Sequence, residues 1–486
     1  MRRSLAWISI VGLLATTCLS QGCRASRAIR DPEYAGVVNA MAQAPSAPPP
    51  VAMPPVAPPL AGPQPVEVYI GYALTQNPDI QAARKRVEAA ANRVPVAASL
   101  QDPMLGVTSF PSPVQTAAGE QTLSMNASQQ IPWHGKLDTR ASVAEAETNV
   151  ARAQLAAAEL DVIEQVKRAY YELYYIQKAI RITEDDKKLL IDLTKIAEAK
   201  YRTGAVSQQD VLRAQVETSN LDSDLIRLRQ QLESSQAQLA QLLHVSPETP
   251  VRAVEQLPAE QIPRGLDRLY EQAVSARPEL HAQLAALTRD RQNVELARLN
   301  YFPDVTASVI WNNIADQGLS PVANGQDSVG LGVSVNVPLY RKRLDAAVRA
   351  GEAQATATAR QYDSLRDKTT AQVKSLFVQA TSQYELVKLF RDDIIPKADQ
   401  TLRVSSSAYE TGKTDFLQLI DNWRQLLRFQ IMYQRLESQL QQTLASLERV
   451  VGGQLPLEAA PPSNQPRPPE QLPPVPPAPM PQPAKP

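Results

Sequence analysis

Residues 329–337 read Val-Gly-Leu-Gly-Val-Ser-Val-Asn-Val, so every second side chain is apolar and those between are small or polar. This period of two predicts a β-strand with one apolar and one polar face. The alternation returns at residues 123–128 and 305–311, and more weakly at 103–110. A wall between lipid and a water-filled lumen has this pattern, and about ten tilted residues cross a bilayer. A half-exposed sheet of a soluble protein has it too.

The strands lie between helical segments that are too long for an ordinary globular domain. Residues 138–201 contain neither proline nor glycine, are rich in alanine, and carry apolar residues at heptad spacing. At 1.5 Å per residue they would form a rod of roughly 95 Å. Gly204 ends this helix, and residues 207–210 provide the polar start of the next. We also expect helices at residues 66–98, 266–299, 344–409 and 414–450.

Helices and strands occur twice in the same order, about 200 residues apart. Residues 73–80, Ala-Leu-Thr-Gln-Asn-Pro-Asp-Ile, return as Ala-Val-Ser-Ala-Arg-Pro-Glu-Leu at 273–280. Tyr-Arg-Thr-Gly at 201–204 returns as Tyr-Glu-Thr-Gly at 409–412. A repeat of this length indicates two halves of one body.

The N-terminus has the features of an export signal. Two arginines precede a short apolar core, and small residues lead to Cys23. This resembles a bacterial lipoprotein signal, in which Cys23 would be acylated and carry palmitate. Ser20 stands where such signals usually have leucine, so Cys18 is an alternative acceptor and a plain secretory signal is another reading. These are the only cysteines, which excludes a disulfide framework for the body.

We therefore divide the chain into six segments. They are a signal peptide (1–22), a lipid-anchor segment with a Pro-rich linker (23–65), a first repeat (66–246), a connector (247–265), a second repeat (266–452) and a Pro-rich tail (453–486). We expect the Pro-rich segments to be disordered, because proline lacks a backbone donor. They would act either as spacers or as inert solvated tails.

Composition argues against several function classes. The 50 basic and 50 acidic residues leave no net charge for a nucleic-acid partner. The three histidines, His134, His244 and His281, form neither a metal-ligand spacing nor a nucleophile–base pair. No phosphate-binding glycine loop occurs, so energy must come from another protein. We expect no enzyme activity, no cofactor and no metal site.

Four strands are too few to close a barrel. Because open sheet edges are not tolerated in hydrocarbon, membrane-embedded strands of this kind must be pooled by several chains. Several chains together could supply enough strands for a closed pore. Their helices would then pack side by side into a hollow cylinder.

Over about residues 66–452 the chain resembles the TolC-like outer-membrane factors, the exit ducts of tripartite efflux pumps and type I secretion systems. The resemblance rests on the duplicated helix–strand–strand–helix order and the two Tyr-x-Thr-Gly turns. It also rests on Asn77-Pro78 and Arg277-Pro278, and on Pro132 and Pro338 after the strands. Residues 131–136, Ile-Pro-Trp-His-Gly-Lys, are similar to the heavy-metal efflux branch.

The resemblance implies a mainly α protein with a membrane β-barrel: a homotrimer with a shared 12-stranded barrel and an α-helical tunnel. It would be a passive conduit for drugs or metal ions, lipid-anchored in the outer membrane of a Gram-negative-type cell and extending into the periplasm. Its partners would be a periplasmic adaptor protein and an inner-membrane pump, of the RND type. The alternatives are a type I protein secretion duct and a non-conducting, lipid-anchored periplasmic coiled-coil scaffold.

The resemblance also implies functional residues. The adaptor would dock at the periplasmic tips, formed by Tyr201, Thr203, Gly204, Tyr409, Thr411 and Gly412. Two positions of the family's acidic aperture ring correspond to Gln418 and Asp421, and Asp210 stands at the matching place in the first repeat. The family's basic residue is expected at Thr414, but the basic residue here is Lys413, which puts the family's salt-bridge latch in doubt. Three Asp421 carboxylates would favour cations in a narrow pore; alternatively Asp421 caps or solvates a helix.

Overall fold

The computed structural model describes residues 33–34, 60, 62–257, 262–263, 265–316 and 324–455. The chain divides into two compact units, Met1–Pro55 and Val56–Pro486. The second unit contains both repeats, and the description below concerns this unit. Cys18, Cys23 and the Pro-rich segments 45–59 and 456–486 lie outside the described residues.

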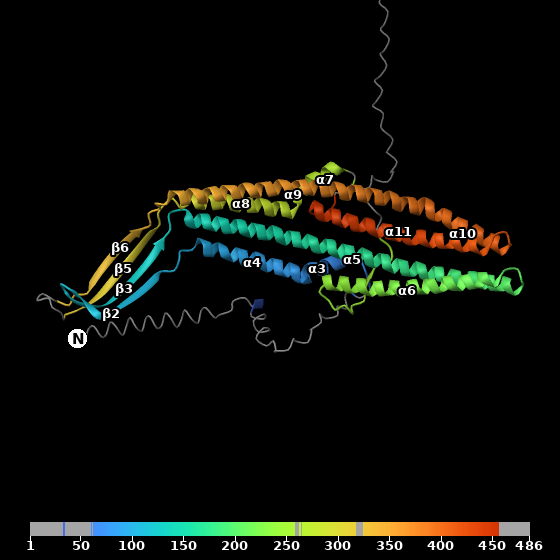
Figure 1. The fold of residues 1–486 in the computed structure, drawn as a ribbon, viewed down its shortest axis with the longest axis horizontal. Coiled ribbons are helices and arrows are strands. Elements are labelled where there is room, and N and C mark those ends of the chain that lie inside the picture. The colour runs from blue at the N-terminus through green and yellow to red at the C-terminus, as the bar shows by residue number, and fades with distance from the viewer. Residues whose placement is uncertain are drawn as a thin grey trace, which may run out of the picture. The chain divides into compact units, whose positions relative to one another are not determined.

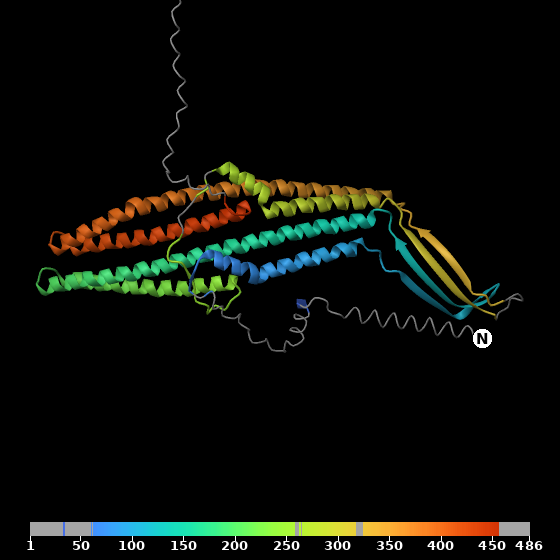
Figure 2. The same ribbon diagram turned by 180° about the vertical axis from the view of Figure 1, so that it is seen from behind.

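Each repeat consists of two short helices, two strands and a hairpin of long helices (Figure 1). The first repeat comprises α3 (Val66–Gln76), α4 (Pro78–Ala98), β2 (Met104–Thr116), β3 (Gly119–Ile131), α5 (Lys136–Arg202) and α6 (Gln208–Leu242). The second comprises α7 (Leu266–Ala276), α8 (Pro278–Leu299), β5 (Val305–Ala315), β6 (Ser328–Val335), α9 (Arg341–Leu389), η2 (Phe390–Ile394), α10 (Ile395–Glu410) and α11 (Phe416–Val451). A short parallel pair, β1 (Gly62–Gln64) and β4 (Val251–Ala253), joins the start of the body to the connector. Within this unit the strands lie at one end of the helices and the hairpin turns at the other (Figure 2).

The four long strands form one antiparallel sheet in the order β2-β3-β5-β6. The register aligns side chains of one kind across all four strands. One such row is apolar: Val107, Met125, Trp311 and Val329. The next row is polar: Thr108, Ser124, Asn312 and Ser328. The Ser124 hydroxyl donates to Asn312 Oδ1 at 2.7 Å, and Asn312 Nδ2 donates to Ser328 Oγ at 3.0 Å. The predicted two-faced sheet is therefore present, and in one chain β2 and β6 each have one open edge.

Strand β2 is longer than the sequence predicts. The alternation in the sequence predicts this strand over residues 103–110, but β2 continues to Thr116, and residues 117–118 form the turn. Pro111 and Pro113 cannot donate to a strand partner. They are accommodated because β2 is an edge strand whose register shifts between Ser109 and Val114.

The short helices of both repeats are broken where the sequence predicts continuous helices. The residue before a proline is restricted to extended backbone, so α3 ends at Asn77 (φ −63°, ψ 125°) and α7 ends at Arg277 (φ −66°, ψ 119°). The Asn77 side chain then caps α4 by accepting the amide of Asp79 at 2.9 Å. Its Nδ2 donates to the Leu242 carbonyl at 2.9 Å, which ties the break to the end of α6.

The predicted helix over residues 344–409 is also interrupted. A π-helical turn, η2, separates α9 from α10, and Pro396 is the second residue of α10. Proline cannot donate into the helical ladder, and a widened turn is one way to accommodate it. The equivalent helix of the first repeat, α5, runs without interruption for 67 residues. The second hairpin therefore has a discontinuity that the first lacks.

Where strands meet helices, a buried ion pair joins the two repeats. Lys136 Nζ lies 2.7 Å from Asp304 Oδ1, and their side chains are 3% and 13% exposed. Asp304 also accepts the backbone amide of Trp133 at 2.8 Å, and the Trp133 and Phe302 rings stack at 5.2 Å. Burial by itself raises the pKa of Asp304, but the hydrogen bonds from Lys136 and Trp133 outweigh it and hold the pKa below its usual value.

We expect Asp304→Asn to destabilise the fold by about 3 kcal/mol, because it leaves the Lys136 ammonium buried without a counter-charge. The measurement is the thermal unfolding midpoint of the full chain in detergent. The difference in stability between wild type and Asp304→Asn should be complete above pH 4, roughly the ordinary aspartate pKa. It should vanish as the pH falls through the lowered pKa of Asp304. The double variant Lys136→Met with Asp304→Leu keeps the site buried without charge and should recover most of the loss. Equal midpoints for wild type and Asp304→Asn would rule out a stabilising role for the pair.

Candidate functional site

The two hairpin turns share one backbone geometry. Gly204 (φ 73°) and Gly412 (φ 75°) adopt the left-handed conformation that favours glycine. After each glycine, the next amide returns to the carbonyl five residues earlier: Ala205 to Lys200 at 2.9 Å, and Lys413 to Ala408 at 2.8 Å. A side chain added at either glycine would meet open space. The glycines are therefore required by the backbone conformation alone.

The tyrosines of the two turns have different environments. Tyr201 is 45% exposed, whereas Tyr409 is 2% exposed. The centroids of the Tyr409 and Phe416 rings are 5.4 Å apart. Lys200 Nζ lies 4.7 Å from the centroid of the Tyr409 ring and donates a hydrogen bond to the Tyr409 carbonyl. Its hydroxyl is buried without a hydrogen-bond partner in the described part of the chain. Burial, aided by the Asp210 carboxylate, raises the pKa of Tyr409 to about 12.

The acidic residues of the two hairpins lie within electrostatic reach of one another. Partial burial raises the pKa of Asp210. The Arg213 guanidinium partly opposes this rise in pKa, and the Asp415 carboxylate adds to it. The sequence analysis did not single out Asp415, which caps α11 by accepting the amide of Gln418 at 2.9 Å. The structure thus brings Asp210 of the first hairpin close to the start of α11 in the second.

The two predicted aperture residues of α11 are both exposed and both paired. Gln418 Nε2 donates to Asn422 Oδ1 at 3.1 Å. Asp421, whose side chain is 52% exposed, lies 3.1 Å from Arg424 Nη1 one turn later. In the single chain, Asp421 is therefore part of an ion pair.

Two consecutive residues of α11 hold the second hairpin to the first. Trp423 is 1% exposed and donates its Nε1 hydrogen to Asp186 of α5 at 3.0 Å. Arg424 forms an ion pair with Glu217 of α6 as well as with Asp421. The sequence analysis missed these contacts because their partners are 237 and 207 residues apart. A tryptophan beside an arginine near the start of a predicted helix was the one local signal.

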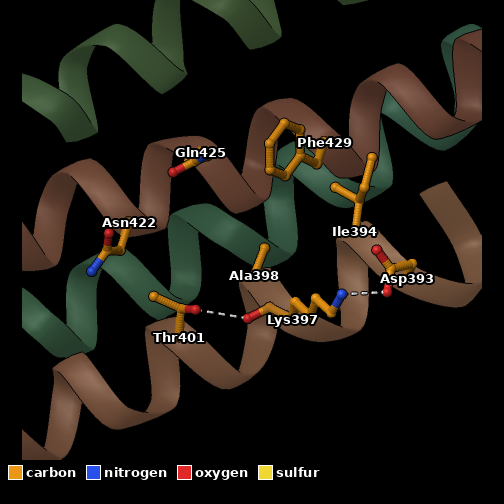
Figure 3. Close-up of a pocket in the computed structure, with 8 residues that line it drawn as sticks. All are labelled: Asp393, Ile394, Lys397, Ala398, Thr401, Asn422, Gln425 and Phe429. Carbon is orange, nitrogen blue, oxygen red and sulfur yellow. Dashed lines mark hydrogen bonds and ion pairs between the residues drawn. The ribbon is translucent and has the colours of Figure 1, made fainter. Parts of the chain in front are cut away.

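A cavity of about 280 Å³ lies between α10 and α11, beside the π-helical turn (Figure 3). Its lining residues are Asp393, Ile394, Lys397, Ala398, Thr401, Asn422, Gln425 and Phe429. Lys397 Nζ lies 2.5 Å from Asp393 Oδ1, and the Thr401 hydroxyl donates to the Lys397 carbonyl at 2.8 Å. The charged groups of the cavity are therefore already paired with each other.

The strands differ from the helices in charge. Among β2, β3, β5 and β6 the one charged residue is Glu120, at the start of β3. Several of their apolar side chains are largely exposed in the single chain, among them Leu105 (81%), Leu331 (85%) and Val333 (75%). In the described part of the chain, no helix has both the length and the apolar character to cross a bilayer.

Comparison with known proteins agrees with this architecture. The family model described as "Outer membrane efflux protein" matches residues 69–244 and 269–453, which are the two repeats. The cobalt-zinc-cadmium resistance protein CzcC of Cupriavidus metallidurans is 24% identical over 81% of this chain and 91% of its own length. The pyoverdine export outer membrane protein OpmQ of Pseudomonas putida is 23% identical over 68% of this chain and 70% of its own length.

Solved structures have the same fold. The outer membrane protein VceC of Vibrio cholerae superposes with a TM-score of 0.67 at 19% identity, covering 80% of this chain and 96% of its own. A structure of CusC gives a TM-score of 0.69 at 18% identity, covering 85% of this chain and 99% of its own. With both repeats matched by the family model, the chain belongs to the outer membrane efflux protein family.

Proposed function

We propose that this protein is the outer-membrane channel of a tripartite efflux pump, a passive conduit for small molecules such as drugs or metal ions. The observation that carries the proposal is the open-edged sheet with apolar rows on one face. Exposed edges must be paired in hydrocarbon. Pairing β6 of one chain with β2 of the next in a trimer would close a barrel of twelve strands. The row containing Trp311 would then face lipid and the row containing Asn312 the lumen.

The other parts of the chain fit this assembly. The long hairpins would continue the barrel as an α-helical tunnel through the periplasm. Acylation of Cys23 would anchor the N-terminus in the outer membrane. The relatives named for metal resistance and for pyoverdine export support an export role.

The turn residues are proposed as the periplasmic tips. Tyr201, Thr203, Gly204, Tyr409, Thr411 and Gly412 would form the docking surface for an adaptor protein, which would couple the channel to an inner-membrane pump of the RND type. Gln418, Asp421 and Asp210 would line the aperture. The pairing of Asp421 with Arg424 lowers the fixed negative charge that this aperture would carry.

The channel itself is tested in planar bilayers. The wild-type chain should form oligomers stable in sodium dodecyl sulfate and conduct as single channels. Leu331→Arg should abolish both, because arginine on a lipid-facing strand costs about 2–4 kcal/mol near the bilayer midplane. Ser334→Arg, on the polar face of the same strand, should still assemble. A soluble wild-type monomer without conductance would establish the non-conducting scaffold instead.

The tip assignment is tested at Gly412. Gly412→Val should lose export while keeping the trimer, because a β-branched residue in left-handed backbone costs about 1–2 kcal/mol or more and displaces the turn. Gly412→Asn is the matched control, since asparagine tolerates this conformation. The readout is drug and metal-salt susceptibility of a deletion strain carrying each variant. Unchanged resistance with Gly412→Val would contradict the assignment of this turn.

A further inference from the structure

Asp186 is a buried carboxylate with an incomplete set of partners. It lies on α5, is 7% exposed, and accepts one hydrogen bond, from Trp423 Nε1 at 3.0 Å. No cation in the described part of the chain forms an ion pair with it. A buried carboxylate is usually paired or satisfied by several donors, because losing hydration costs several kcal/mol. Asp186 has one neutral donor.

The charged groups around Asp186 are all engaged elsewhere. On its own helix, Lys187 reaches Asp222 of α6 at 2.5 Å, and Asp185 pairs with Lys188 at 2.9 Å. Glu184 of α5 pairs with Arg229 of α6 at 3.0 Å, and Glu217 of α6 is paired with Arg424 of α11. Trp423 itself belongs to a buried apolar cluster that includes Leu190, Leu419 and Ile420.

This environment makes the contact sensitive to protonation. Burial raises the pKa of Asp186 to about 6, Asp185 adds to the rise, and the Trp423 hydrogen bond only partly opposes it. For an acid with a raised folded-state pKa, the buried arrangement binds the proton more tightly than the exposed one. The buried arrangement therefore gains stability as pH falls through 6 and loses it as pH rises.

We propose that Asp186 positions Trp423 as a proton-dependent brace between the two helical hairpins. The protonated carboxyl holds α11 against α5, and the ionised carboxylate favours their separation, which would expose it to water. Trp423 lies within the first two or so turns of α11, close to the hairpin turn, so separation here would change the spacing of the tips. An effect of the brace on channel opening rests on the function proposed above. The contact between Asp186 and Trp423 does not depend on that function.

The size of the effect follows from the two protonation states. With a pKa of about 6 in the braced arrangement and 3.8 when exposed, the braced population gains about tenfold over the separated one between pH 7 and pH 5. Asp186→Asn keeps an oxygen that can accept the indole hydrogen but removes the titration. Asp185→Asn changes an exposed neighbour on the same turn and is the matched control.

The first experiment reports the brace without requiring a working channel. Trp423 is left as the sole tryptophan by replacing Trp7, Trp133 and Trp311 with phenylalanine in the full chain. Its fluorescence in detergent is then recorded from pH 4.5 to pH 8. We expect a transition near pH 6 that is lost in Asp186→Asn and kept in Asp185→Asn, there at a somewhat lower pH because the Asp185 carboxylate helps to raise the pKa of Asp186. A transition that persists in Asp186→Asn, or is missing from the parent, would overturn the proposal.

The second experiment connects the brace to conduction. Single-channel open probability is measured while the helical-tip side of the bilayer is titrated from pH 7 to pH 5. The wild-type and Asp185→Asn channels should open up to about tenfold less often at pH 5, whereas Asp186→Asn should not respond. Equal pH responses of wild type and Asp186→Asn would refute the gating role. A fluorescence transition without any conductance would instead contradict the proposed channel function and leave the brace standing.

Discussion

A β-sheet with open edges cannot remain in hydrocarbon, because each unpaired backbone amide or carbonyl costs several kcal/mol there. This constraint governs the rest of the molecule. Since β3 pairs with β5, the repeats are joined inside one chain and the open edges fall on β2 and β6. Closure therefore has to come from neighbouring copies. The Lys136–Asp304 ion pair joins the two repeats where the strands end and the helices begin, so the helices keep the relative placement that the sheet sets.

The duplication supplies two similar hairpins that differ in ways relevant to movement. Both end in a left-handed glycine, but α5 is continuous whereas its counterpart is divided by a π-helical turn before Pro396. Tyr201 is exposed, while Tyr409 is buried between the hairpins. The first hairpin is thus the more regular of the two, and the second carries both the helical discontinuity and the side chains that bind it to its neighbour.

The contact between α5 and α11 changes in character along its length. Away from the hairpin turns it is dominated by charge: Arg435 binds Glu172 of α5, and Arg449, whose side chain is 10% exposed, binds Asp161 of α5 as well as Glu279 of α8. Each of these ion pairs contains opposite charges. Nearer the turns, the buried contact is Asp186 with a neutral indole. An underpaired carboxylate is costly to bury when ionised, so ionisation of Asp186 weakens this end of the contact.

The sequence by itself determined the element order, the two-faced strands, the helix-ending turns and the requirement for several chains. These follow from periodicity, repetition and glycine or proline positions, which are local properties. The breaks at Asn77, Arg277 and Phe390–Ile394 were missed although a proline follows each within two residues, because a proline can also lie inside a helix, as Pro95 does in α4. Only the tertiary structure decided the pairing of Lys136 with Asp304, of Arg424 with Glu217, and of Trp423 with Asp186. Such contacts join residues far apart in the chain, and packing, not local pattern, selects one partner among many of the same type.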